Sequence, residues 1–277
     1  IKRLKNEDII LEATNNNLVI KQNKSTFKLP TYDANEFPVL NKSENLKELS
    51  ISTINFINSI RKITPAIDNN NPKFELNGAL LDIKSQKINF VSTDTRRLAL
   101  SFLENMNNDE AQLIIPKKAI IEIQKLFLDE AKISYDNTNL VISNQHTKFF
   151  TKLINGKFPD YERIIPKNKN FRIQLSRESM VDAIKQISII SSEIKITFKP
   201  EKVVFESLND DNIEAKTEIE FKTGLENDIY LAVNSRYILD FLSNIENSHF
   251  TLGFNDSGLP FTLENDNFTT IVMPIMI

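Results

Sequence analysis

The sequence contains no cysteine and no tryptophan, and it has only two histidines and five glycines among 277 residues. Without cysteine there is no disulfide framework, thiolate metal site or cysteine nucleophile, and a reducing, cytoplasmic compartment is expected. His146 and His249 leave little material for histidine-based catalysis or a zinc site. Gly253 and Gly258 have the spacing of a phosphate-binding loop, but a Leu-Pro pair follows where Lys and Ser or Thr are required. The composition therefore argues against most enzymes, and neither a cofactor nor a metal is expected.

Neither charge nor hydropathy points to a membrane. The 34 basic and 37 acidic residues give a net charge of −3, which provides no bulk attraction for nucleic acid but leaves the local distribution of charge open. No apolar run approaches the ~18–20 residues of a membrane span, and the start of the chain, IKRLKNEDII, lacks the apolar segment of a signal peptide and an initiator Met. With 40% hydrophobic residues the chain is expected to bury a core, and its length suggests about two domains.

An internal repeat of about 120 residues organises the chain. Residues 18–20 (LVI) correspond to residues 140–142, 122 positions later, and the Phe-Pro pair at 37–38 corresponds to the pair at 158–159. A third, weaker copy closes with the Met-Pro pair at 273–274. Chance similarity among Asn-rich strand segments is the alternative, but the same order of helices and strands in each copy favours a true repeat.

Helical and strand patterns recur within the copies. Ser50 and Ser176 are predicted as N-caps of the first helix in two successive copies. Alternating apolar residues between the helices predict antiparallel strands, for example in the segments KINFVSTD and EIKITFKP. No segment rich in Pro, Gly or Ser separates the copies, so close packing of the modules is expected. Apolar residues at every third or fourth position predict helices at 49–63, 115–128, 175–190 and 233–245.

Four segments, at residues 75–82, 91–100, 156–167 and 271–277, resemble the bacterial sliding clamps, the β subunits of DNA polymerase III. Residues 91–100 (VSTDTRRLAL) resemble the family's TDGHRLA segment, and residues 156–167 (GKFPDYERIIPK) resemble its GRFPDYRRVLPK segment. Residues 75–82 and 271–277 match the family in order and spacing. The resemblance covers the whole chain but begins within the family's first domain, so about 80 residues of that domain would be missing.

The resemblance implies an α+β DNA clamp fold, built from repeated modules that each pack two helices on antiparallel sheets. The expected domains are a remnant of the first module (1–43), the second module (44–165) and the third module (166–277). Two full-length protomers of such a protein would form a ring around double-stranded DNA without reading its sequence. The ring would act as a non-catalytic processivity factor that tethers the DNA polymerase III alpha subunit, the clamp loader, other polymerases and repair proteins. Because most of the first module is absent, this chain is itself expected to be a monomer or a weak or altered dimer.

Partners of this family insert a short peptide into a cleft between the second and third modules. The family's Gly-His pair is Thr95-Arg96 here, and its Arg-Leu ending is Met276-Ile277, which removes a cation; a more apolar rim is therefore expected. The resemblance places the cleft at Leu76, Thr93, Arg97, Leu98, Pro159, Arg163, Ile164, Asn234, Tyr237, Pro260, Ile271, Met273, Pro274 and Ile275.

Encircling DNA requires a modest positive lining on helices that contact phosphates. Lys117 and Lys118 match a basic pair of the family, whereas each of the other candidates has ordinary solvated residues as its alternative. Ring closure in the family pairs two strand edges, and the matching residues here are Phe27 and Leu29 on one side and Ile189 and Ile190 on the other. The DNA-facing candidates are Arg61, Lys62, Lys117, Lys118, Arg177, Lys185 and Arg236.

A catalytic site is one alternative interpretation of the cluster that contains Asp94. Asp94 with Arg96 and Arg97 could suggest a catalytic carboxylate, but no His, Cys or metal-ligand partner is near in the sequence. We therefore predict that Asp94 orders the turn after its strand and pairs with an arginine.

A duplicated β-rich surface module for a sugar or protein ligand is the alternative function, and it predicts exposed aromatic side chains on loops. The 19 phenylalanines instead fall mostly in strand patterns that are typical of a core.

Overall fold

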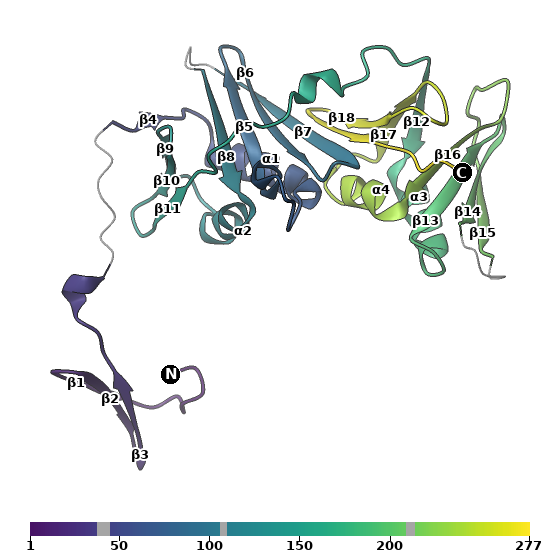
Figure 1. Ribbon diagram of the computed structural model, residues 1–277. Helices are drawn as coiled ribbons and strands as arrows, with labels where there is room; N and C mark the ends of the chain where they lie inside the picture. The colour runs from purple at the N-terminus through teal and green to yellow at the C-terminus, as the bar shows by residue number, and fades with distance from the viewer. Residues whose placement is uncertain (38–44, 106–109, 209–213) are drawn as a thin grey trace. The chain divides into compact units, whose positions relative to one another are not determined.

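The computed structural model describes residues 1–37, 45–105, 110–208 and 214–277 (Figure 1). Its contacts divide the chain into two compact units, residues 1–44 and residues 45–277. Pro38, which completes the first Phe-Pro pair, lies outside the described residues.

The first unit is an antiparallel sheet of three strands, β1 (Ile10–Thr14), β2 (Asn17–Gln22) and β3 (Ser25–Pro30), followed by the short helix η1 (Ala34–Glu36). Ile20 on the central strand lies opposite Leu11 and Phe27, and Leu18 lies opposite Leu29. These alternate positions place the apolar side chains on one face of the sheet. Ile20 is buried, whereas Phe27 and Leu29 are each 47% exposed.

The first half of the second unit contains two helices, α1 (Thr53–Ile63) and α2 (Lys117–Leu126). The short helices η2 (Thr64–Ala66) and η3 (Phe74–Asn77) follow α1. Strands β11-β10-β9-β4 form one antiparallel sheet. The strands of this part are β4 (Lys47–Glu48), β5 (Gly78–Lys84), β6 (Lys87–Thr93), β7 (Arg97–Glu104), β8 (Ala111–Pro116), β9 (Lys132–Tyr135), β10 (Asn139–Ser143) and β11 (Lys148–Lys152).

The rest of the second unit repeats this plan with α3 (Arg177–Ser188) and α4 (Ser235–Leu242), after the short helix η4 (Tyr161–Arg163). Strands β15-β14-β13-β16 form its own antiparallel sheet. The strands are β12 (Phe171–Ser176), β13 (Glu193–Phe198), β14 (Lys202–Ser207), β15 (Lys216–Glu220), β16 (Ile229–Asn234), β17 (His249–Phe254), β18 (Phe261–Asn265) and β19 (Phe268–Val272).

One antiparallel sheet of eight strands, ordered β12-β17-β18-β19-β7-β6-β5-β8, runs through both halves of this unit. The halves meet where β19 pairs with β7, with Ile271 opposite Leu98 and Val272 opposite Arg97. The helices lie along one side of the unit and the shared sheet along the other (Figure 1). Continuous pairing of this kind makes residues 45–277 one structural body, as the lack of a flexible linker predicted.

The core forms where the apolar stripes of the helices pack against the apolar faces of the strands. On β13, Ile194, Ile196 and Phe198 are buried and alternate with more exposed residues, so one face of the strand packs against the core. In α1 the buried residues include Phe56, Ile57, Ile60 and Ile63, whereas Ile54, which the sequence pattern placed on the same stripe, is 50% exposed.

The predicted helix starts are confirmed in one copy and wrong in the other. Ser176 is the N-cap of α3, and its side chain accepts a hydrogen bond from the amide of Ser179. The N-cap of α1 is Ser52 instead of Ser50, and the Ser52 hydroxyl donates to Glu130 at 2.6 Å. Glu130 also accepts the amide of Thr53 at 3.0 Å, so a distant carboxylate supplies the cap that a local serine would otherwise provide.

Candidate functional site

The predicted cleft residues Leu76, Leu98 and Ile271 belong to one buried apolar cluster, which we call the cleft floor. The shared sheet has two apolar faces: Leu80 packs in the cleft-floor cluster, whereas its neighbours Ala79 and Leu81 pack in the main core beneath the helices. The cleft floor is therefore on the side of the sheet away from the helices, where β7 meets β19. The cluster is completed by Leu80, Val91, Ile114, Phe158 and Tyr161.

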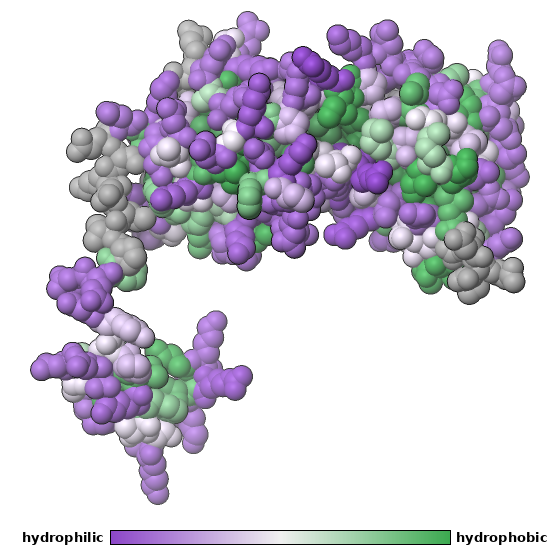
Figure 2. Space-filling model, in the orientation of Figure 1, coloured by the Kyte–Doolittle hydropathy of each residue, from purple (hydrophilic) through white to green (hydrophobic). Residues whose placement is uncertain are grey.

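The C-terminal segment continues from β19 across the end of the cleft floor. The amide of Met273 donates to the carbonyl oxygen of Arg96 at 2.9 Å, and the amide of Ile275 donates to the carbonyl oxygen of Ala232 at 2.7 Å. These two bonds fix the backbone on both sides of Pro274 while the Met273 side chain stays 40% exposed. Figure 2 shows apolar side chains gathered on the surface where η4 and β18 lie in Figure 1. An exposed methionine beside an apolar floor is suited to ligands of varied shape.

Arg97 is a predicted cleft residue, but its side chain is buried. Its Nε lies 3.0 Å from Asp94 Oδ2, its Nη1 lies 2.7 Å from Asp240 Oδ2, and its Nη2 donates to the carbonyl oxygen of Pro65 at 2.5 Å. The guanidinium group also lies over the ring of Tyr237, 4.5 Å from its centroid. The cation is thus fully engaged within the protein, and it ties β7 to α4 across the junction of the two halves.

The prediction for Asp94 is confirmed. Its Oδ1 accepts the amides of Arg96 and Arg97, each at 3.0 Å, and its Oδ2 pairs with the Arg97 guanidinium. Asp94 therefore orders the turn between β6 and β7, and these contacts engage both of its carboxylate oxygens. Thr93, also a predicted cleft residue, donates its hydroxyl to the carbonyl oxygen of Arg97 at 2.6 Å and is buried.

Tyr237 and Asn234 lie at the start of α4. Asn234 is the N-cap, and its Oδ1 accepts the amide of Arg236 at 3.0 Å. Burial raises the pKa of the half-buried Tyr237 hydroxyl, and the nearby Asp94 carboxylate raises it further. The neutral phenol is therefore the species present at physiological pH, and it is able to donate a hydrogen bond to a ligand.

The remaining predicted cleft residues are on the surface around the floor. Pro159 is exposed, Ile164 is 41% exposed, and Pro260 is half-buried just before β18. The Arg163 side chain is 86% exposed and pairs with Asp160, with Nε and Oδ2 2.7 Å apart. These groups are accessible to a ligand, but they do not form the buried part of the site.

A buried polar network below η4 was missed in the sequence. The Tyr161 hydroxyl donates to Asp82 Oδ2 at 2.7 Å and accepts from Asn89 Nδ2 at 3.0 Å, and Gln112 donates to the other carboxylate oxygen at 3.1 Å. Burial, followed by the bond to Asp82, raises the pKa of Tyr161 well above its ordinary value. This network fastens η4 to β5 and β6 beside the cleft floor. In the sequence, the signal for this network is the tyrosine of the FPDY motif. The motif does not indicate which distant residues this tyrosine contacts.

The predicted DNA-facing residues divide by their contacts. Lys62 donates to Asn267 Oδ1 at 2.8 Å, Lys117 donates to the carbonyl oxygen of Ile67 at 2.7 Å, and Arg177 donates to the carbonyl oxygen of Leu242 at 2.8 Å. Burial lowers the pKa of both lysines. These three cations stabilise loops and helix ends, which limits their freedom to contact a ligand. The remaining four, Arg61, Lys118, Lys185 and Arg236, have exposed side chains.

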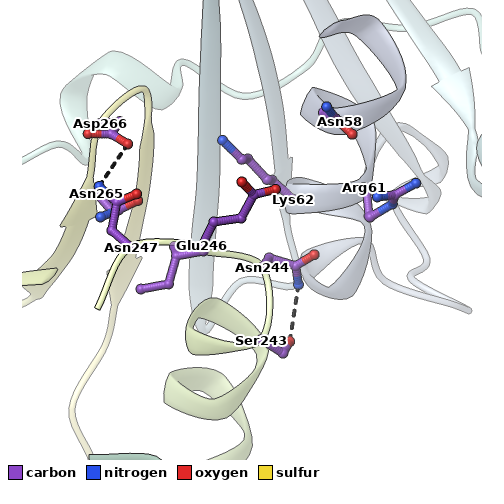
Figure 3. Close-up of a pocket in the computed structure, with 10 residues that line it drawn as sticks. Asn58, Arg61, Lys62, Ser243, Asn244, Glu246, Asn247, Asn265 and Asp266 are labelled. Atoms are coloured by element: carbon purple, nitrogen blue, oxygen red, sulfur yellow. Dashed lines mark hydrogen bonds between the residues drawn. The ribbon is translucent and has the colours of Figure 1, made fainter. Parts of the chain in front are cut away.

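A polar groove of about 290 Å³ contains two of these cations (Figure 3). Arg61 and Lys62 project from the last turn of α1, opposite Asn244 and Glu246 in the segment after α4. The groove crosses the junction between the halves of the second unit, on the helical side. Its lining is Asn58, Arg61, Lys62, Ser243, Asn244, Ile245, Glu246, Asn247, Asn265 and Asp266.

The predicted ring-contact residues are apolar and accessible within their own units. Phe27 and Leu29 lie on the edge strand β3 of the first unit. Ile189, at the C-terminal end of α3, is 82% exposed, and Ile190 is 41% exposed. Exposed apolar side chains can contribute to a protein contact where they form a contiguous patch.

Among the described residues, no three or more His, Asp or Glu side chains are grouped so that they could hold a metal ion. Across the same ranges, none of the helices is both long and apolar enough to cross a membrane.

The chain matches known proteins along its length. Residues 50–160 match the central domain of the DNA polymerase III beta subunit, and residues 162–276 match its C-terminal domain. The beta sliding clamp of Helicobacter pylori is 36% identical over 294 aligned residues, which cover 99% of this chain and 79% of the relative. The beta sliding clamp of Pseudomonas aeruginosa is 28% identical, covering 99% of this chain and 78% of the relative.

Solved structures agree with these matches. The crystal structure of the Helicobacter pylori beta clamp bound to a DNA ligase peptide has a TM-score of 0.92 and 35% identity, covering all of this chain and 78% of that one. The DNA polymerase III subunit beta from Pseudomonas aeruginosa has a TM-score of 0.90 and 25% identity, covering all of this chain and 79% of that one. The predicted α+β clamp fold is thereby confirmed, and the chain belongs to the family of bacterial beta sliding clamps, the beta subunits of DNA polymerase III.

Proposed function

We propose that this sliding clamp anchors replication and repair proteins by a short peptide that binds over the cleft floor. Membership of the clamp family carries the general function: the chain is a non-catalytic processivity factor of DNA polymerase III. The apolar floor of Leu76, Leu98 and Ile271 beside the exposed Met273 supports the peptide site. A clamp from this family has been crystallised with a DNA ligase peptide, which supports the same class of ligand here. The alternative of a duplicated sugar- or protein-binding surface module is not favoured by any of these relatives.

Met273→Ala tests the peptide site. The substitution removes a side chain that is 40% exposed and leaves its backbone bond to Arg96 intact, so the fold should survive. An apolar contact that becomes buried when the peptide binds is worth about 1.4 kcal/mol, so its loss lowers the affinity roughly tenfold. Fluorescence anisotropy with a labelled DNA ligase peptide measures the effect. Leu128→Ala, at a 77% exposed position after α2, is the matched control. Equal affinity of the wild type and Met273→Ala would remove the basis for this cleft.

DNA would contact the helical side of the second unit through its exposed cations. Arg61, Lys118 and Lys185 have no ion-pair partner among the described residues and lie on helices α1, α2 and α3. Phosphate contacts by such groups carry no base specificity and weaken as salt rises. The proposed partners are therefore double-stranded DNA on this side and the DNA polymerase III alpha subunit, clamp loader, other polymerases and repair proteins at the cleft. A cytoplasmic location and the domain boundaries at 1–43, 44–165 and 166–277 belong to the same proposal.

Closure of the ring would use one contact surface from each of the two units. The edge strand β3, with Phe27 and Leu29, is available in the first unit, and Ile189 and Ile190 are available beside the sheet that ends in β15. Unpaired edge strands readily pair with another chain, and the apolar side chains would strengthen such a contact. A homodimer of the full-length protein is part of this proposal.

A further inference from the structure

Asparagine followed directly by glycine occurs twice in the sequence, at residues 77–78 and 155–156. In this dipeptide the backbone nitrogen of the glycine can attack the carboxamide carbon of the asparagine side chain, because glycine has no Cβ to obstruct the approach. The reaction requires a side-chain amide and a backbone nitrogen that are free to meet. Two identical dipeptides in different surroundings therefore separate the effect of the fold from the effect of the local sequence.

The fold holds both residues of the first dipeptide in place. Asn77, at the end of η3, accepts the amide of Asn71 through Oδ1 at 2.8 Å and donates to the carbonyl oxygen of Asn71 through Nδ2 at 2.9 Å. Gly78 is buried at the start of β5, opposite Pro116. A Cβ on Gly78 would lie 2.6 Å from the carbonyl oxygen of Ile115, so the backbone is closely packed there. Attack on Asn77 therefore requires local opening of the structure.

The second dipeptide lies in an exposed bend after β11. Asn155 and Gly156 belong to neither a helix nor a strand, and both are exposed. Within the described residues, neither the Asn155 carboxamide nor the Gly156 amide has a hydrogen-bond partner. The chain is anchored on either side, because the amide of Ile154 donates to the carbonyl oxygen of Ile114 at 2.8 Å and Phe158 is buried in the cleft floor. The Asn155 side chain can therefore turn onto the Gly156 nitrogen without breaking a hydrogen bond to the protein.

Packing against η3 explains why the residue after Asn155 is a glycine. A Cβ on Gly156 would lie 2.5 Å from Cγ and 2.7 Å from Oε1 of Glu75, so an added side chain would displace Glu75. The same lack of a side chain leaves the Gly156 nitrogen unshielded. A negative charge gained at position 155 would arise close to the Glu75 carboxylate, and the two like charges would repel each other.

We propose that Asn155 is a deamidation site, at which the folded protein converts asparagine into aspartate and isoaspartate. The Gly156 nitrogen bonds to Cγ of Asn155, the Cγ–Nδ2 bond breaks, and Nδ2 leaves as ammonia with the proton of the Gly156 amide. Water then opens the cyclic imide at either of its carbonyl groups, which gives aspartate or isoaspartate at position 155. The isoaspartate product adds a methylene group to the main chain between the anchored residues Ile154 and Phe158.

Peptide mapping compares the two dipeptides in the same sample. The full chain is incubated at mildly alkaline pH, with and without urea, and mass spectrometry follows the aspartate and isoaspartate formed. Trypsin places the two asparagines in separate peptides, residues 74–84 and 153–157. In urea both positions are expected to react at similar rates, because both precede glycine. In the folded protein, position 155 is expected to stay within about threefold of its rate in urea, because no opening is needed. Position 77 is expected to react roughly thirtyfold more slowly than position 155, the factor for breaking two hydrogen bonds of ordinary strength.

Asn155→Gln is the matched variant, because its longer side chain would have to close a larger ring. It is expected to abolish the modification at position 155 and to leave the rate at position 77 unchanged. Equal rates at the two positions in the folded protein would overturn the proposal, and so would a rate at position 155 that folding lowers more than about tenfold. The measurement uses neither a peptide ligand nor DNA, so its outcome is independent of the proposed function.

Discussion

Thr95, in the turn between β6 and β7, keeps a left-handed backbone conformation, with φ 74°, that glycine adopts without a steric penalty. For a residue with a branched Cβ, this conformation costs about 1–2 kcal/mol of conformational free energy. Three backbone amides of this turn donate hydrogen bonds to the side chains of Thr93 and Asp94. None of these hydrogen bonds involves the Thr95 side chain, so they remain when that side chain is removed. We therefore expect Thr95→Gly to raise the free energy of unfolding, by about 1 kcal/mol after the added flexibility of glycine in the unfolded chain.

Urea denaturation of the two proteins at pH 7 measures this difference. Gly224→Ala is the opposite control, because Gly224 has the same φ of 74° and no atom within 4 Å of an added Cβ. It should lower the free energy of unfolding by roughly 1 kcal/mol through backbone strain alone. A Thr95→Gly variant that is less stable than the wild type would show that the threonine side chain makes a compensating contact.

At the scale of elements, the turn between β9 and β10 depends on one carboxylate. Asp136 Oδ1 accepts the amides of Thr138 and Asn139, at 2.7 and 2.8 Å. Burial alone would raise the pKa of Asp136, but these bonds and those from the side chains of the same two residues lower it to about 2. The ionised form is thus favoured by folding. Its contribution is complete above the unfolded pKa near 4 and is lost as pH falls towards 2.

Asp136→Asn keeps an acceptor oxygen in the turn but cannot ionise. We expect the wild type to be more stable than this variant at pH 7, by on the order of 1 kcal/mol after solvent screening, and the difference to disappear by about pH 2. Urea titrations of both proteins between pH 7 and pH 2 measure the difference in their free energies of unfolding. Taking this difference cancels the effect of the other carboxylates, which both proteins share. A constant gap across this range would mean that Asp136 acts only through its shape.

Local chemistry explains which elements and contacts could be predicted from the sequence. Ser176 caps its own helix and Asp94 binds amides two and three residues away, so their roles are contained in short segments. The α1 cap failed for the opposite reason, because Glu130 supplies it from 77 residues away. Likewise Arg97 binds Asp240, which lies 143 residues away in the sequence. The periodic pattern of a single helix or strand does not identify a partner at that separation.

The cleft shows the same limit. Leu98 and Ile271 could be grouped through the family resemblance, and the pairing of β7 with β19 does place them opposite each other. The burial of Arg97 and the network of Tyr161 with Asp82 could not be predicted from sequence patterns, because both depend on which strands become neighbours. Alternation along one strand predicts which face a residue occupies, but not which distant side chain it meets.

For the whole molecule, the junction of β7 with β19 decides whether residues 45–277 unfold together. Two further links cross it: Lys62 binds Asn267, and Asn267 exchanges hydrogen bonds with Phe102, donating through Nδ2 at 2.8 Å and accepting the amide at 3.0 Å. A junction with continuous strand pairing and buried polar links should transmit unfolding from one half to the other. The wild-type unit is therefore expected to show one main calorimetric transition, with equal calorimetric and van't Hoff enthalpies.

Arg97→Ala should weaken that coupling. The substitution leaves the carboxylates of Asp94 and Asp240, both largely shielded from solvent, without their shared cation, at a cost of about 3–5 kcal/mol for a broken buried pair. Because Asp94 belongs to one half and Asp240 to the other, the loss falls on the junction, and scanning calorimetry should resolve two transitions. Arg172 is 55% exposed and pairs with Glu264 in the same half of the unit, so Arg172→Ala should change the free energy of unfolding by no more than about 1 kcal/mol and keep a single transition. If Arg97→Ala also unfolds in one transition, merely at lower temperature, the strand pairing alone couples the halves and the buried arginine only adds stability.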